Sequence, residues 1–235
     1  MKISHFIIFV LISLCIQNAF ALDRIWNMRY TLGPDARPSP KFAAGVGLRS
    51  DFGDNVLFPV NIMGALNKEW ELGAKVDMYT YNKLDNMEAS IDLGGRYRIG
   101  AGRFIELDGY FGLNRNNESA LVITYGKDVY IASNFSNFYE ARAGFLEGVT
   151  GEDGYVKFEL GTIPTLHFGH SVLCMIEITS SGSAGHLKDD FMVDIIPKLE
   201  VAFGGTRVRL EFDIGIMQEE NNDQKSIGLY VQTAL

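Results

Sequence analysis

Charged side chains recur at every second position along much of this sequence. Between residues 207 and 214, charged residues occupy every odd position and valine, leucine, phenylalanine and isoleucine occupy the even ones. Side chains of this type can filter ions when water reaches them, or form ion pairs when they face one another. We expect the following residues to line one shared interior: Lys75, Asp77, Asp92, Arg96, Arg98, Glu106, Asp108, Glu140, Arg142, Glu200, Arg207, Arg209, Glu211 and Asp213.

A second group of residues that could bind a metal or catalyse a reaction lies at 166–171, where His167, His170 and Ser171 are close in sequence. Two histidines three positions apart suggest a metal site, and a histidine near a serine suggests a hydrolase. The stretch offers no further ligands at the spacing of a metal site, and no acidic residue or asparagine accompanies the serine. We therefore expect an exposed turn, no metal, no cofactor and no catalytic residue.

The elements that position the charged residues must have a period of two. A helix would scatter alternate residues around its surface, whereas a strand places each set on one face. Segments between turn signals predict twelve strands, most of them about ten residues long, near the 9 to 11 residues of a tilted membrane-spanning strand. The predicted strands are 41–51, 57–66, 69–79, 88–99, 103–113, 119–131, 138–147, 155–164, 170–179, 191–203, 206–216 and 225–235.

The connectors between these segments mostly alternate in length. Outer-membrane barrels have short periplasmic turns and longer outer loops. In the segment 119–131, Lys127 falls on the apolar face unless Gly126 marks a β-bulge. The predicted outer loops are 52–56, 80–87, 114–118, 148–154, 180–190 and 217–224, and the predicted inner turns are 67–68, 100–102, 132–137, 165–169 and 204–205.

The first 21 residues have the order of a secretory signal peptide. Lys2 precedes an apolar run, and small residues flank the expected cleavage site after Ala21. Loss of this segment changes the formal charge from −8 to −9, and an acidic chain is a poor partner for nucleic acid. The prolines in 22–40 interrupt any strand, so we expect a periplasmic lead-in there, with a segment inside the lumen as the alternative, and a barrel over 41–235.

Alternation alone also fits a secreted soluble β-sandwich that binds glycans. Strand length, the even strand count, the connectors and the signal peptide favour an all-β, antiparallel, up-and-down transmembrane β-barrel in the outer membrane of a Gram-negative cell. Aromatic residues near strand ends favour it too, because membrane barrels have interfacial aromatic girdles. These residues are Trp70, Tyr97, Phe104, Phe111, Tyr139, Phe145, Tyr155, Phe191 and Phe203.

Charged residues on a lipid-facing surface would cost several kcal/mol each, so the charged set should face the lumen. That lumen is either a water-filled pore or a plug closed by ion pairs. Glycines on the same face leave room and slightly favour the pore: Gly45, Gly47, Gly73, Gly94, Gly112, Gly144, Gly161 and Gly215. The final strand ends on Leu235, an apolar residue that the barrel-assembly machinery could recognise.

Two neighbouring segments resemble a known group of barrels. Residues 70–75 read WELGAK and residues 91–98 read IDLGGRYR. Both runs resemble outer-membrane transporters of the phenol-degradation meta-pathway group. That resemblance implies passive uptake of small solutes, hydrophobic ones included, and it brings no catalytic residues.

The sequence thus predicts an outer-membrane channel or passive transporter for small solutes, with a charged polar lumen. Its expected partners are outer-membrane lipid, the assembly machinery and the solute itself. The alternative is a barrel with a closed lumen that serves as a structural or adhesive surface protein.

Overall fold

A computed structural model describes residues 42–51, 55–81, 86–100, 102–113, 119–146, 154–169, 171–184, 191–217 and 225–235. The predicted signal peptide and the lead-in 22–40 lie outside these ranges. Within them, no helix has the length and apolar character needed to cross a bilayer.

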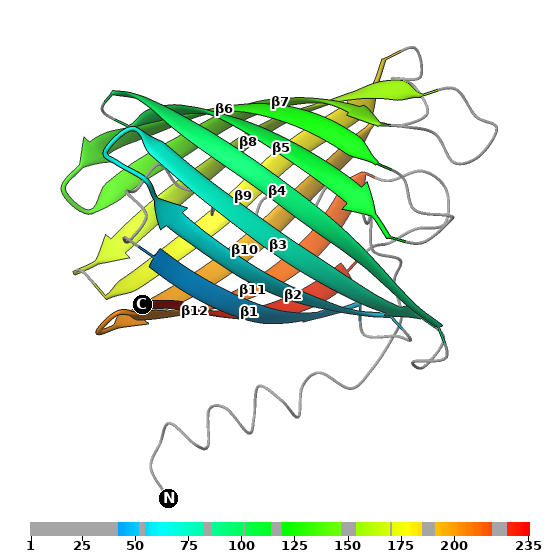
Figure 1. Cartoon of the computed structure of the whole chain (residues 1–235). Helices are drawn as coiled ribbons and strands as arrows, with labels where there is room; N and C mark the ends of the chain where they lie inside the picture. The colour runs from blue at the N-terminus through cyan, green and yellow to red at the C-terminus, as the bar shows by residue number, and fades with distance from the viewer. Residues whose placement is uncertain are drawn as a thin grey trace, which may run out of the picture.

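Twelve strands form one closed barrel in which every neighbouring pair is antiparallel (Figure 1). Each strand pairs with the one before and after it in the chain, and β1 pairs with β12 to close the sheet. The strands are β1 (Phe42–Ser50), β2 (Val56–Ala65), β3 (Trp70–Tyr81), β4 (Asn86–Gly100), β5 (Arg103–Gly112), β6 (Ala120–Ala132), β7 (Phe135–Leu146), β8 (Tyr155–Phe168), β9 (Val172–Ser183), β10 (Met192–Phe203), β11 (Thr206–Met217) and β12 (Lys225–Ala234).

The closing seam joins the two ends of the barrel sequence in continuous register. Ala43 lies opposite Ala234 and Ser50 lies opposite Ile227, with every intermediate pair formed. The amide of Leu235 donates a hydrogen bond to the carbonyl of Phe42 at 2.9 Å. The chain therefore closes its sheet without leaving an edge strand, which removes the unpaired backbone groups that a membrane would not satisfy.

The connectors differ in length between the two ends of the barrel more sharply than the sequence predicts. At the end that carries the C-terminus they are 66–69, 101–102, 133–134, 169–171 and 204–205, whereas those at the other end are longer or equal in length (Figure 1). The predicted turn 132–137 is wrong, because β7 begins at Phe135. The predicted turn 165–169 is also wrong in position, because β8 continues to Phe168.

Of the two alternatives for Lys127, the structure shows the outward position, because Gly126 does not mark a β-bulge. The pairing of β6 with β7 is regular through Gly126 and shifts only between Tyr130 and Ala132. Lys127 consequently faces outward, where it is exposed and lies opposite Arg103 of β5. Both residues lie near the tight turns, where long basic side chains can extend from an apolar surface to the membrane interface.

Apolar residues cover the outside of the barrel, and charged residues fill the inside. On β4 and β5, Leu93 and Leu107 point outward and are each 52% exposed, while Arg96 and Asp108 are buried. A soluble β-sandwich has the opposite arrangement, so that alternative is wrong.

Most of the predicted interfacial aromatic residues lie on this outer surface. Trp70 and Tyr97 pack against each other there with ring centroids 4.9 Å apart. Two assignments are wrong: Phe104 is buried inside the barrel, and Tyr155 packs against a buried interior cluster.

Candidate functional site

The candidate site is the barrel interior, and the structure places all fourteen predicted residues on inward-facing strand positions. Ten of them are buried: Lys75, Asp77, Asp92, Arg96, Glu106, Asp108, Glu140, Arg142, Glu200 and Glu211. The other four retain some contact with solvent: Arg98, Arg207, Arg209 and Asp213. Burial of so many charges requires that they compensate one another.

On β3 and β4, one lysine joins two aspartates. Lys75 Nζ lies 2.8 Å from Asp77 Oδ2 and 3.7 Å from Asp92 Oδ2, and all three side chains are at most 2% exposed. Lys75 and Asp92 are direct cross-strand partners, so the antiparallel register alone brings their opposite charges together.

Two arginines of β4 extend this network toward the tight turns. Arg96 Nη2 lies 2.6 Å from Glu106 Oε2 on β5, and Arg98 Nη2 lies 2.5 Å from Glu71 Oε1 on β3. The guanidinium of Arg96 also lies 3.9 Å above the ring centroid of Phe104. These contacts fix Arg96 inside the barrel through ion pairing and a cation–π interaction.

The far side of the barrel holds a similar group on β9, β10 and β11. Lys198 forms an ion pair with Glu177, and its Nζ lies 3.3 Å from Glu211 Oε1. The side chains of Lys198 and Glu177 are fully buried. The ion pairs of Lys75, Arg96, Arg98 and Lys198 with their acidic partners form what we call the ionic belt.

The interior also contains apolar clusters, which the predicted charged lumen did not include. One lies toward the tight turns and one toward the longer connectors, so apolar side chains flank charged ones along this wall. Their inward positions can be read from strand parity, but the sequence analysis gave weight only to charged residues. The buried members are Phe104, Phe138, Ile163, Leu173 and Met175 in one cluster, and Tyr110, Ala120, Val122 and Leu146 in the other.

Three of the inward glycines, Gly45, Gly47 and Gly161, leave less room than the sequence suggested, because neighbouring side chains occupy the space. A Cβ added to Gly161 would lie 2.6 Å from Glu140 Oε1, and one added to Gly47 would lie 2.8 Å from Pro59 Cγ. These glycines therefore allow close packing of larger neighbours. Their presence does not by itself indicate an open pore.

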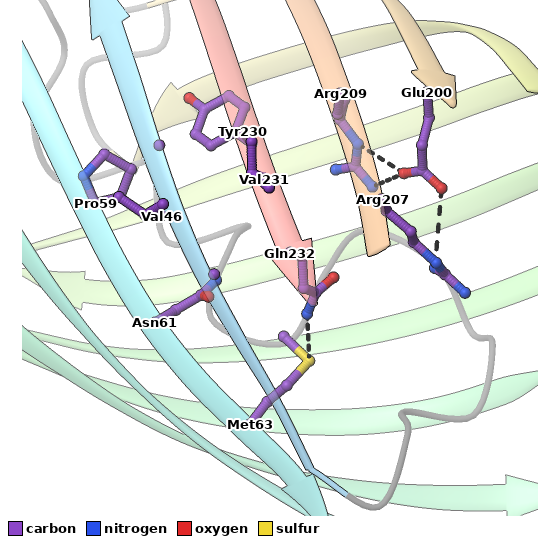
Figure 2. A pocket seen from close by; sticks show the side chains of 12 residues that line it. Val46, Pro59, Asn61, Met63, Glu200, Arg207, Arg209, Tyr230, Val231 and Gln232 are labelled. Atoms are coloured by element: carbon purple, nitrogen blue, oxygen red, sulfur yellow. Dashed lines mark hydrogen bonds and ion pairs between the residues drawn. The ribbon is translucent and has the colours of Figure 1, made fainter. Parts of the chain in front are cut away.

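A cavity of about 50 Å³ remains beside β1, β2, β11 and β12, enough for a few water molecules (Figure 2). Its wall includes the apolar Val46 and the polar Asn61, Tyr230 and Gln232, and the amide of Gln232 donates a hydrogen bond to Met63 Sδ at 3.1 Å. Gly45 and Gly47 lie on the same wall.

Two arginines reach this cavity from β11. Arg209 Nη2 lies 2.6 Å from Glu200 Oε2, while Arg207 Nη1 lies 3.9 Å from Glu200 Oε1 (Figure 2). The Arg207 side chain is 38% exposed, against 13% for Arg209 and 6% for Arg49, which pairs with Asp213. Arg207 is thus the most accessible cation of these ion pairs.

The 166–171 stretch differs from the predicted exposed turn. His167 belongs to β8, and its Nε2 lies 2.8 Å from the hydroxyl oxygen of Ser136 on β7. Among the described residues, no carboxylate contacts His167, and no cluster of three metal-ligating side chains occurs. Ser171 lies in the turn before β9, and His170 lies outside the described residues.

No protein-family model and no curated protein sequence matches this chain. Solved structures do match. The KdgM porin has a TM-score of 0.60 at 11% identity, covering 82% of this chain and 99% of its own. The NanC porin has a TM-score of 0.59 at 10% identity, covering 83% and 100%.

The translocator domain of the autotransporter NalP from Neisseria meningitidis is similar as well. It has a TM-score of 0.58 at 12% identity, covering 83% of this chain and 86% of its own. At such low identity the likeness concerns the fold and leaves the solute open. The chain therefore has the closed, all-antiparallel barrel fold of outer-membrane porins.

Proposed function

We propose that this chain is an outer-membrane channel for small solutes, with a narrow path along the inner faces of β11, β12, β1 and β2. The observation that carries this proposal is the cavity beside Arg207. Elsewhere along the described wall, the ionic belt and two apolar clusters consist of closely packed, buried side chains. A solute would meet least resistance where side chains are small and the arginine is exposed.

The charge beside this cavity favours anions over cations. The charged residues that line the cavity are Arg207, Arg209 and Glu200, so the wall itself has a local excess of positive charge. Arg209 Nη1 also lies 3.7 Å from Glu211 Oε1, which leaves Arg207 as the main source of this excess. The KdgM porin, which has the same fold, is known in complex with disordered oligogalacturonate, an acidic sugar chain. Uptake of hydrophobic solutes, which the resemblance to meta-pathway transporters implies, stays a prediction, because the cavity wall combines apolar residues such as Val46 and Pro59 with the exposed Arg207.

Charge reversal at the cavity tests the proposed path. A unit charge about 4 Å from a passing ion is worth about 1 kcal/mol in water, so Arg207→Glu should lower the anion-to-cation permeability ratio about five-fold or more. The measurement is the reversal potential in a salt gradient across a planar bilayer.

Arg103→Glu is the matched control, because it makes the same change of charge on the outer surface. Its reversal potential should equal that of the wild type. If Arg207→Glu also left the potential unchanged, the path would lie elsewhere.

A closed barrel with a structural or adhesive role is the second candidate, and the fully buried pair of Lys198 and Glu177 favours it. The two residues lie on the neighbouring strands β9 and β10, so the pair does not cross the lumen, but its complete burial means that water does not reach it there. The absence of current through folded protein would select this candidate.

The route to the membrane is part of the proposal. Cleavage after Ala21 would release the chain into the periplasm, and the last strand would then present its apolar residues to the assembly machinery. Of the predicted lumen residues, we propose that Arg207, Arg209 and Glu200 determine ion selectivity, because these three line the cavity.

A further inference from the structure

The outer surface of the barrel carries very few charges, and their placement is uneven. Among the described strand residues that face outward, only three are charged. Lys225 is the first residue of β12, at the end with the longer connectors. Arg103 and Lys127 both lie toward the tight turns.

Arg103 and Lys127 lie directly opposite each other on β5 and β6. Opposed residues in an antiparallel pair have Cβ atoms about 4.5–5.5 Å apart, and like charges at that spacing repel. Neither side chain has an ion pair or hydrogen bond with another residue in the described ranges. Basic residues at a membrane interface are ordinary, but that alone does not explain why two cations should be paired.

The surroundings of this pair leave space and provide an apolar wall. On β7, Tyr139 lies opposite Lys127 and is 46% exposed, and Tyr125 precedes Lys127 on the same face. On β4, Gly100 lies opposite Arg103 with a φ of 115°, and a Cβ placed there would meet nothing within 4 Å. A group of phosphate size therefore has access to both cations.

We propose that Arg103 and Lys127 together bind the phosphate of an anionic phospholipid in the periplasmic leaflet. A phosphate between them would replace repulsion with two charge-assisted contacts, and the arginine could donate two hydrogen bonds to it. Acyl chains would continue along the apolar surface that includes Ile105 and Tyr125. The inference rests on the proposed location in the outer membrane, but it does not depend on the barrel conducting ions.

Lipid retention measured by native mass spectrometry tests this site. The purified full chain is reconstituted with equal amounts of phosphatidylglycerol and phosphatidylethanolamine and extracted in mild detergent. The mass of the protein with its bound lipid is then measured. We expect the wild type to retain phosphatidylglycerol preferentially. Arg103→Gln combined with Lys127→Gln should reduce that preference at least about five-fold, because each lysine or arginine near the membrane surface attracts anionic lipid.

Two further variants distinguish a specific site from a general effect of charge or folding. Lys225→Gln removes an outward cation at the opposite end and should retain phosphatidylglycerol as the wild type does. Lys127→Glu places opposite charges across β5 and β6, so the barrel should fold at least as well while losing the lipid preference. Heat-modifiable migration on gels confirms folding for each variant.

Three results would overturn the proposal. One is equal retention of phosphatidylglycerol by the double glutamine variant and the wild type. Another is a loss of phosphatidylglycerol retention in Lys225→Gln as large as the loss in the double glutamine variant. The third is displacement of all bound lipid by millimolar inorganic phosphate, which would indicate a site for free phosphate. Because lipid retention is measured without any current, a barrel that retains lipid but does not conduct would reject only the channel.

Discussion

Lys198 shows how strongly a buried cation depends on its partners. Its side chain is fully buried and contacts Glu177 and Glu211. Lys198→Met removes the lysine that pairs with the fully buried Glu177, while Glu211 keeps its contact with Arg209 at 3.7 Å. Because a buried charge loses its partner, we expect the free energy of unfolding to fall by about 3–5 kcal/mol. Lys225→Met changes an exposed lysine in the same way and should alter it by less than about 0.5 kcal/mol.

Denaturant titration of the two variants in phospholipid vesicles provides the measurement. Equal midpoints for Lys198→Met and Lys225→Met would show that Lys198 is hydrated and that the interior around it is open. The same experiment therefore reports on the packing of the ionic belt.

Glycines give a second prediction at the scale of single residues. A Cβ at Gly126 would contact the ring of Phe104 and lie 2.8 Å from Phe138 Cζ, whereas one at Gly95 would lie an ordinary 3.5 Å from Leu72 Cδ2. Gly126→Ala should lower the unfolding free energy by about 1–3 kcal/mol through overpacking. Gly95→Ala, the control, should be neutral or slightly stabilising because alanine favours a strand more than glycine.

Thermal or urea unfolding measures both alanine variants. Phe104→Leu in the Gly126→Ala background should restore part of the lost stability by making space. If Gly126→Ala were as stable as the wild type, the close packing of Phe104 against Gly126 would be contradicted.

At the scale of strands, the sequence predicts the number of elements well because alternation persists through every strand. It predicts boundaries poorly where prolines or polar residues interrupt the pattern. Pro164 suggests a strand end, yet it faces outward and pairs with Asn137, and only the β8–β9 ladder is interrupted there. The polar run 133–137 suggests a long turn, but only 133–134 connect the two strands.

The outward face of each strand should tolerate charge according to its depth. Leu93 lies at the centre of β4 and Ile99 lies near its tight-turn end, and both are exposed. Arginine at the bilayer midplane costs about 2–4 kcal/mol, and near the interface about 0–1 kcal/mol. Leu93→Arg should therefore unfold at lower denaturant concentration than Ile99→Arg in lipid vesicles, and the reverse order would contradict this placement in the membrane.

At the scale of the whole molecule, the barrel wall is lined unevenly. Two apolar clusters and the ionic belt pack against β3 to β11, and a small cavity lies beside β1, β2, β11 and β12. Strand parity predicts which residues point inward. It does not predict which of them meet, because contacts across the interior depend on closure of the barrel and on side-chain conformation. The sequence could therefore identify the charged lining but could not choose between a pore and a plug.

Single-channel recording across a planar bilayer tests the proposed channel most directly. The protein should first be shown to be folded by its heat-modifiable migration. We predict discrete current steps that are small beside those of larger porins, because twelve strands enclose less space than sixteen, and a preference for anions. The absence of current steps from folded protein would contradict the proposed channel.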